Sequence, residues 1–180
     1  MKPYPYTVET ERLLLRPFEI KDGSRVRELV NCREIYDVTL LIPYPYEEGM
    51  GEEWISTHAA NYFANKGVVF AVVEKESQHI IGTVGIGGNS IHNRGELGYW
   101  MGVPYWGKGY CTEAGKAAIQ FAFDVLGYHR VEAHHFECNP ASGRVMQKIG
   151  MQYEGKMIDH VLKGGTYHNC IFYGIVNPNQ

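Results

Sequence analysis

The chain has 180 residues, of which 44% are hydrophobic and 21% charged, and its formal net charge is −3. This length and composition are typical of one soluble globular domain, here residues 1–180. The absence of a Lys/Arg block disfavours nucleic acid as a main partner, and no apolar run approaches the roughly 20 residues of a membrane span. The first residues lack a signal-peptide core, and the four scattered cysteines indicate reduced thiols. We therefore expect a cytoplasmic protein without a membrane partner, and the sequence leaves open whether it forms a homodimer.

Hydrophobic periodicity predicts alternating helices and strands. In the first half we expect a strand at residues 13–18, a helix capped by Asp22 at 22–30 and a stiff aromatic connection at 42–46. A second helix at 54–63 and three strands at 68–73, 80–86 and 96–101 should follow. In the second half we expect a long helix at residues 114–125, a strand at 131–136, a short helix capped by Asn139 at 139–150, and a terminal hairpin at 153–176. This order predicts a mixed α/β (α+β) domain with a largely antiparallel sheet of six to seven strands and about four helices.

The stretch YWGKGYCTEA, residues 105–114, lies between an expected strand and the long helix. In it, Gly107 and Gly109 flank Lys108 just before the helix begins. The first amides of a helix lack intrahelical partners, and the helix macrodipole adds about half a positive charge at that end. Glycines also allow a ligand to approach the bare backbone. The stretch therefore predicts a binding site for a phosphate or pyrophosphate.

Two common phosphate loops fit this chain poorly. Residues 102–108 read GVPYWGK, like the front of a P-loop, but Gly109 stands where a P-loop needs Ser or Thr to hold magnesium. No G-x-G-x-x-G opens a helix, and GIGG at residues 85–88 leads into a turn between strands. Nucleotide hydrolysis and dinucleotide binding are therefore disfavoured. The pyrophosphate of coenzyme A remains as the candidate ligand.

The loop resembles that of the GNAT acyltransferase superfamily, and within it the RimJ/RimL-like group, which acetylates protein N-termini. GNAT proteins carry Q/R-x-x-G-x-G/A, and residues 106–111 read WGKGYC, with Trp106 and Cys111 at the two departures. RimJ/RimL-like proteins often have an aromatic residue first and continue T-E-A, as residues 112–114 do. The segments TERLLLRP (10–17) and NPASGRVMQKIG (139–150) also match the group, so the resemblance extends from residue 10 to about 175.

This resemblance implies the GNAT fold, in which two parallel central strands splay apart and the pantetheine arm of acetyl-CoA enters the gap. It also implies direct attack of an amine on the thioester, without an acyl-enzyme. The implied coenzyme site consists of the end of one strand, the glycine-rich loop and the starts of two helices: Met101, Trp106, Gly107, Lys108, Gly109, Tyr110, Cys111, Thr112, Asn139 and Ser142.

Acetyl transfer needs a neutral amine, a polarised carbonyl and a stabilised or protonated thiolate. The usual GNAT proton donor is a tyrosine seven residues after the Asn, and that position is Met146 here. The RimJ/RimL-like group has a serine three residues after the Asn, which implies Ser142 as the donor. A purely structural role stays open for Ser142, which can support the helix start. The resemblance also implies that Asn139 bonds to the pantetheine arm.

For the catalytic base, Glu96 is the first candidate, because GNAT enzymes often place a glutamate or a water-holding residue on this strand. A solvated charge at the strand end is the alternative interpretation. Asp159 and His160 on the terminal hairpin are second choices. The group commonly has an Asp late in this hairpin, but Asn169 stands near that position and cannot act as a base.

The histidines near Cys138 also raise the question of a metal site. His134 and His135 are adjacent on an expected strand, where successive side chains point to opposite faces. The chain also lacks the ligand spacing of zinc sites. We therefore expect no metal.

The acceptor amine is the least determined part of the reaction. Ordinary pKa values are about 10.4 for lysine and about 7.7–8.0 for an α-amine, so deprotonation at pH 7 costs about 4.6 and about 1 kcal/mol. Without an obvious strong base, the α-amine of a peptide is the better acceptor. The expected cleft aromatics, or else core residues, are Tyr44, Tyr46, Trp54, Tyr99, Trp100 and Tyr105. A small-molecule amine acceptor and a non-catalytic acyl-CoA sensor remain alternatives, and Met146 favours the sensor.

Overall fold

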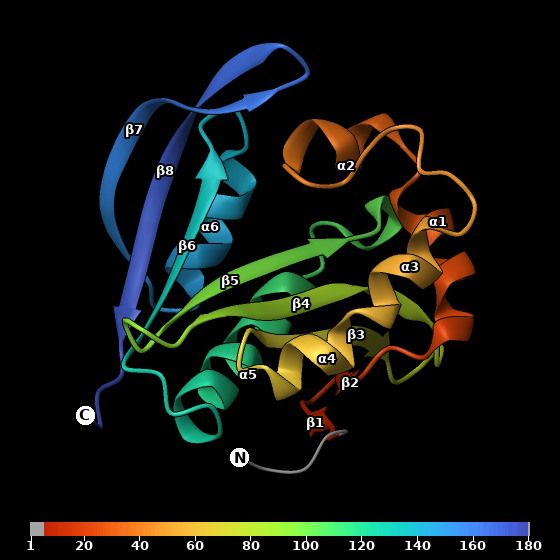
Figure 1. The fold of residues 1–180 in the computed structure, drawn as a ribbon, viewed down its shortest axis with the longest axis horizontal. Helices are drawn as coiled ribbons and strands as arrows, with labels where there is room; N and C mark the ends of the chain where they lie inside the picture. The colour runs from red at the N-terminus through yellow and green to blue at the C-terminus, as the bar shows by residue number, and fades with distance from the viewer. Residues whose placement is uncertain (1–5, 180) are drawn as a thin grey trace.

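The structure is a computed structural model that describes residues 6–179, which form one eight-stranded sheet with helices on both faces (Figure 1). The strand order is β1-β2-β3-β4-β5-β6-β8-β7. The strands are β1 Val8–Glu9, β2 Leu13–Arg16, β3 Gly67–Glu74, β4 Ile80–Asn89, β5 Arg94–Met101, β6 Arg130–Phe136, β7 Gln152–Lys163 and β8 Thr166–Val176. All neighbours are antiparallel except β5 and β6, which confirms the prediction of a largely antiparallel mixed sheet.

Within residues 6–179 there are six α-helices and two 3-10 helices. They are η1 Ile20–Asp22, α1 Gly23–Val30, α2 Arg33–Val38, α3 Met50–Ser56, α4 His58–Phe63, η2 Val103–Tyr105, α5 Tyr110–Asp124 and α6 Pro140–Lys148. Helix α5 packs against β2, β4, β5 and β6, and α1 and α3 lie on the other face of the sheet (Figure 1). None of these described helices is both long and apolar enough to cross a bilayer.

The sequence of β3 explains why both faces of the sheet are covered. Its residues GVVFAVVE are apolar at nearly every position, which is typical of a strand buried on both faces. Phe70 and Val72 belong to the core beneath α5, whereas Ala71 and Val73 belong to the core under α1 and α3. The sheet therefore separates two hydrophobic cores.

Strands β5 and β6 are paired only at their first residues. Three Cα pairs join them, the last of which is Glu96 with Glu132. Strand β5 nevertheless continues to Met101, and β6 continues to Phe136. Beyond the last pair the two strands diverge (Figure 1). The splayed pair of parallel central strands is therefore confirmed.

The segment between the first two expected helices differs from the prediction. An additional short helix, α2, lies between residue 30 and the aromatic connection, where no helix was expected. The helix expected over residues 54–63 is two helices, α3 and α4, which meet at Thr57. The hydroxyl of Thr57 donates to the carbonyl of Trp54 at 2.8 Å. Such a bond from a side chain to the preceding turn competes with regular helix hydrogen bonding and often bends a helix.

Asp22 is the N-cap residue of α1, as predicted, but its side chain does not cap the helix with a hydrogen bond. The carboxylate of Asp22 pairs with the guanidinium of Arg16 at 2.7 Å and accepts from the amide of Glu19 at 2.8 Å. It makes no side-chain bond to the amides of α1. The carboxylate of Asp22 therefore bonds to Arg16 of β2 and to the start of η1, and not to the amides of α1.

The terminal hairpin forms as predicted and reaches across the molecule to α2. Strands β7 and β8 turn at Gly164 and Gly165, both of which have positive φ angles (+56° and +81°). Beside this turn, the ammonium of Lys163 donates to the carbonyls of Tyr36 and Thr39, at the end of α2. The turn of the hairpin thus contacts α2 on the far side of the gap between β5 and β6 (Figure 1).

Candidate functional site

The glycine-rich loop forms a helix N-terminus with free amides, as its sequence predicts. Gly107 and Gly109 have φ angles of +75° and +84°, a region that residues with a Cβ rarely adopt. Helix α5 begins at Tyr110, and the amide of Glu113 makes the bond to the Gly109 carbonyl at 3.1 Å. The amides of residues 110–112 precede that first helical bond and emerge at the positive end of the helix dipole. Such an end can hold a pyrophosphate.

Two side chains hold this loop in place. The indole of Trp106 donates to the carbonyl of Met101 at 2.6 Å and so ties the loop to the end of β5. Arg12, between β1 and β2, donates to the carbonyl of Lys108 at 3.0 Å and pairs with Glu113 at 2.7 Å. The resemblance includes Arg12 and Glu113 in two separate motifs, and the structure brings these motifs together. Because Glu113 offsets the charge of Arg12, this pair acts as a tie between the loop and the strand region before it.

Cys111 lies just inside the start of α5. Burial raises the pKa of its thiol to about 12, so the thiol is protonated at neutral pH. A protonated thiol is a poor nucleophile. This agrees with a packing role for the Cys111 side chain, while its backbone amide belongs to the free amides of the loop.

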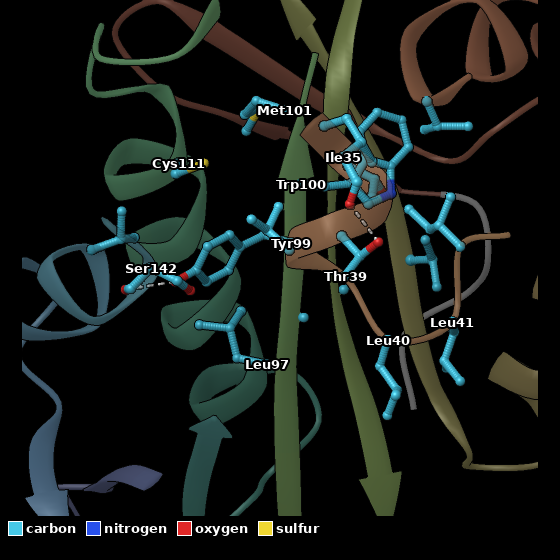
Figure 2. Close-up of a pocket in the computed structure, with 18 of the residues that line it drawn as sticks. Ile35, Thr39, Leu40, Leu41, Leu97, Tyr99, Trp100, Met101, Cys111 and Ser142 are labelled. Atoms are coloured by element: carbon cyan, nitrogen blue, oxygen red, sulfur yellow. Dashed lines mark hydrogen bonds between the residues drawn. The ribbon is translucent and has the colours of Figure 1, made fainter. Parts of the chain in front are cut away.

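The start of α6 faces the loop from the other side of the gap. Asn139 caps the helix, since its side-chain oxygen accepts from the amide of Ser142 at 3.3 Å, and Pro140 follows at the first helical position. The hydroxyl of Ser142 lies 2.8 Å from the hydroxyl of Tyr99 on β5. Burial raises the pKa of Tyr99 well above its ordinary value, so its hydroxyl stays protonated. Figure 2 shows this Tyr99–Ser142 pair.

A single cavity of about 1130 Å³ joins the two faces of the splayed strands. On the α5 side its wall contains the loop, the start of α6, Tyr99 and Ser142. On the other side it contains residues of α1, α2, α3 and α4 and the connection after α2. Tyr99 and Trp100 leave β5 towards opposite sides, as neighbours on a strand do (Figure 2). The cavity therefore passes through the sheet rather than lying on one face of it.

The wall on the α1–α3 side is largely apolar and aromatic. Of the six aromatic residues expected around an acceptor cleft, five line the cavity: Tyr46, Trp54, Tyr99, Trp100 and Tyr105. Tyr44 is not among the lining residues. Leu40 and Leu41, after α2, are exposed at this side, with Leu41 88% exposed. The carboxylates among the described lining residues are those of Glu53 and Glu96.

Glu96 lies on this second side, at the point where β5 and β6 separate. Its carboxylate oxygen Oε1 is 3.1 Å from Nδ1 of His134 on β6. The hydrogen bond from His134 lowers the pKa of Glu96, and burial opposes this effect. Glu96 is therefore a weaker base than an isolated glutamate. Sequence reasoning considered His134 only as a metal ligand, and spacing alone gave no sign of this contact.

The other candidate bases lie outside the cavity. Asp159 lines a separate hollow beside the β7–β8 hairpin, and its amide donates to the side chain of Asn169 at 2.8 Å. The side-chain amide nitrogen of Asn169 in turn donates to the carboxylate of Glu137 at 2.8 Å. His160 is exposed on β7, with its ring centroid 6.4 Å from that of His134. The structure therefore groups Glu96, and neither second choice, with the cavity.

The two adjacent histidines point to opposite faces, as the strand pattern predicts. His134 contacts Glu96, whereas the ring of His135 packs against Gly143 on α6, where a Cβ would come within 2.6 Å of Nε2. Over residues 6–179 no group of three or more His, Cys, Asp or Glu side chains is arranged to hold a metal ion.

A family model described as "Acetyltransferase (GNAT) domain" matches residues 12–152. The chain belongs to the GNAT acetyltransferase family. Among its relatives is an uncharacterized N-acetyltransferase, YoaA, of Bacillus subtilis (strain 168), which is 28% identical over 176 residues, 96% of this chain and 98% of YoaA. Another is the ribosomal protein uS5-alanine N-acetyltransferase of Escherichia coli (strain K12), 28% identical over 180 residues, 94% of this chain and 90% of that protein.

Solved structures of GNAT proteins share the fold. RimJ of Mycobacterium smegmatis, in complex with CoA-disulfide, superposes with a TM-score of 0.87 over 98% of this chain and 90% of that chain, at 18% identity. At this identity the likeness concerns the fold. The RimJ/RimL-like resemblance read from the loop and its flanking motifs is thereby confirmed at the level of family and fold, and this protein is a GNAT acetyltransferase.

Proposed function

We propose that this GNAT acetyltransferase transfers the acetyl group of acetyl-CoA to a primary amine, with the α-amine of a peptide or protein as its preferred acceptor. The observation that carries the proposal is the cavity that passes between β5 and β6. The free amides of residues 110–112 lie at one side of it, and a largely apolar wall lies at the other. A thioester between the two sides is accessible to an amine that enters opposite the coenzyme.

On the coenzyme side, the amides of residues 107–112 bind the pyrophosphate, assisted by the dipole of α5 and the charge of Lys108, while Arg12 holds the loop in place. Trp106 and Met101 keep the loop in register, and Asn139 and Ser142 face the pantetheine arm from α6. Because most of these contacts come from the backbone, the departures at Trp106 and Cys111 leave the binding mode intact.

In the reaction, the amine nitrogen attacks the thioester carbonyl, the new C–N bond forms and the C–S bond breaks. The sulfur leaves as a thiolate and takes a proton from the hydroxyl of Ser142. Tyr99 supports this role, since its buried hydroxyl lies 2.8 Å from that of Ser142 and donates to the Ser142 carbonyl at 3.0 Å, which holds Ser142 at the gap. The pair supplies a proton donor, a role that the side chain of Met146 cannot fill. It therefore favours catalysis over a sensor function.

Glu96 belongs to the acceptor side, where the ammonium form of the substrate must lose a proton before attack. Because its pKa is lowered, Glu96 is a poor base for a lysine side chain, whose pKa is near 10.4. The mismatch is smaller for an α-amine, whose pKa is near 7.7–8.0. The similarity to an alanine N-acetyltransferase supports the same acceptor class. The two lining carboxylates, Glu53 and Glu96, offer little charge for a polyamine.

The test is thiol release from acetyl-CoA with three acceptors: a peptide with a free N-terminal alanine, the same peptide with its α-amine blocked and one lysine added, and spermidine. We expect turnover of the free peptide at a kcat/KM at least tenfold above the others, with mass spectrometry locating the acetyl group on the first residue. Preference for spermidine would support a small-molecule acceptor. Tight acetyl-CoA binding without transfer to any amine would support the sensor.

A further inference from the structure

The contact between Glu96 and His134 forms at the point where the sheet opens. Glu96 is the last residue of β5 that pairs with β6, opposite Glu132. His134 lies two residues further along β6 and therefore on the same face as Glu132. Nδ1 of its ring is 3.1 Å from Oε1 of Glu96, so the two side chains bridge the strands at the start of the gap. Both residues line the cavity.

The ring of His134 is held in one orientation. Nδ1–H donates to the carboxylate of Glu96, and the ring stacks on Phe172 of β8 with centroids 5.0 Å apart and planes 23° apart. With its proton on Nδ1, a neutral imidazole carries its lone pair on Nε2. The His134 side chain is 25% exposed, so a substrate in the cavity can reach this ring.

The charges around this ring belong to several elements. Glu96 and Arg94 on β5 and Glu132 on β6 lie on one side, with Arg94 paired to Glu132 at 3.2 Å. His160 of β7 lies on the other, with its ring centroid 6.4 Å away. Glu96 is the group that contacts His134 directly. A carboxylate in this position stabilises the imidazolium that forms when Nε2 takes a proton.

We propose that Nε2 of His134 takes the proton of the acceptor amine and that Glu96 is the positioning residue that orients His134. This inference rests on the proposed acetyl transfer. The ammonium gives its proton to Nε2, the free amine forms the C–N bond, and the thiolate released from the C–S bond is protonated by Ser142. The nitrogen loses its second proton as the amide forms, and this proton restores the Ser142 hydroxyl through solvent, while the imidazolium returns its own proton to solvent. The net products are the acetylated amine, coenzyme A and one proton.

An imidazole suits this task better than the carboxylate beside it. An ordinary imidazole, with a pKa near 6.5, is about 100-fold more basic than an ordinary glutamate with a pKa near 4.3. It also lies within about 1.5 pKa units of an α-amine. Glu96 is further weakened as a base, because the hydrogen bond from His134 lowers its pKa. Its place beside Nδ1 matches that of a carboxylate that orients a catalytic histidine.

The test compares His134→Ala, Glu96→Gln and a matched control, His168→Ala, by acetyl transfer to a peptide with an N-terminal alanine over a range of pH. His168 stacks on Phe136 with centroids 5.0 Å apart, much as His134 stacks on Phe172, but it does not line the cavity. We expect His134→Ala to lower kcat by on the order of 100-fold, with added imidazole restoring part of the rate and KM for acetyl-CoA unchanged. Recovery at high pH is expected as well, because the amine is then already neutral.

Glu96→Gln should lower kcat less, by about tenfold, and the double variant should lose no more than His134→Ala, because the two residues act as one unit. His168→Ala should keep its rate. The inference is overturned if His134→Ala stays within about threefold of wild type while Glu96→Gln loses its rate. If the wild type binds acetyl-CoA but acetylates no amine, the proposed function fails and this inference fails with it.

Discussion

Substitution of Gly109 tests the coenzyme loop most directly. Its φ of +84° lies in the left-handed region, where a residue with a Cβ costs roughly 1–2 kcal/mol and a β-branched residue is a clear outlier. A Cβ at this position would come no closer than 3.4 Å to the Arg12 guanidinium, so the space around the backbone is not filled by protein. A valine there would occupy the path by which a pyrophosphate approaches the amides of residues 110–112.

Two effects of Gly109→Val must therefore be separated, the strain in the free protein and the loss of ligand binding. Gly127, between α5 and β6, is a matched control, because its φ is +72° and, apart from its chain neighbours, no atom of residues 6–179 lies within 4 Å of its ideal Cβ. Each valine should lower the free energy of unfolding by about 1–2 kcal/mol. For a chain of this size that corresponds to a fall in Tm of about 2–4 °C per kcal/mol.

The assay is thermal unfolding with and without acetyl-CoA. At a ligand concentration 100 times Kd, the wild type and Gly127→Val should each gain about 2.7 kcal/mol of stability. If Gly109→Val raises Kd by 100-fold, its gain at the same concentration falls to about 0.4 kcal/mol. Equal gains in the two variants would show that the coenzyme does not use the loop amides and would refute the reasoning.

Three further substitutions test the walls of the cavity. Ser142→Ala should lower kcat by on the order of 100-fold with little change in KM for acetyl-CoA, and a loss within threefold in steady-state kinetics would leave Ser142 a structural role. Tyr99→Phe should lower kcat by about tenfold, the value of one lost hydrogen bond, and should add nothing to Ser142→Ala; additive losses would separate the two hydroxyls. Lys163→Met should raise KM for the acceptor more than KM for acetyl-CoA, because it frees the hairpin from α2, and equal changes in both would contradict that link.

The regular parts of the fold could be predicted because their patterns are local. The apolar run of β3, the Gly164–Gly165 turn and the Asn139–Pro140 helix start each have signals within a few residues. The features that the sequence did not predict depend on tertiary contacts. The Asp22 carboxylate pairs with Arg16 of β2 instead of bonding to α1, and α2 ends where Lys163, more than 120 residues later, meets its carbonyls.

The same distinction applies to the candidate site. The loop could be identified because free amides and glycines follow from chain order alone. The Tyr99–Ser142 pair joins β5 to α6, and the Glu96–His134 pair joins β5 to β6, so neither has a sequence spacing that reveals it. Strand alternation gave the face on which each side chain lies, but not which residue it faces across the gap.

This difference has a physical consequence for specificity. In the proposed function the donor side depends mainly on backbone amides of the loop, which Arg12 ties to β2 through Lys108 and Glu113. The acceptor side is built from side chains on α2, on the connection after it and on β5 and β6, with the β7–β8 hairpin attached to α2 through Lys163. If the proposed acceptor side is right, substitutions of Leu40, Leu41 and Trp100 should change which amine is acetylated more than they change acetyl-CoA binding. A chain of this kind shows its acyl donor in its sequence, whereas its acceptor is determined by contacts that exist only in the folded protein.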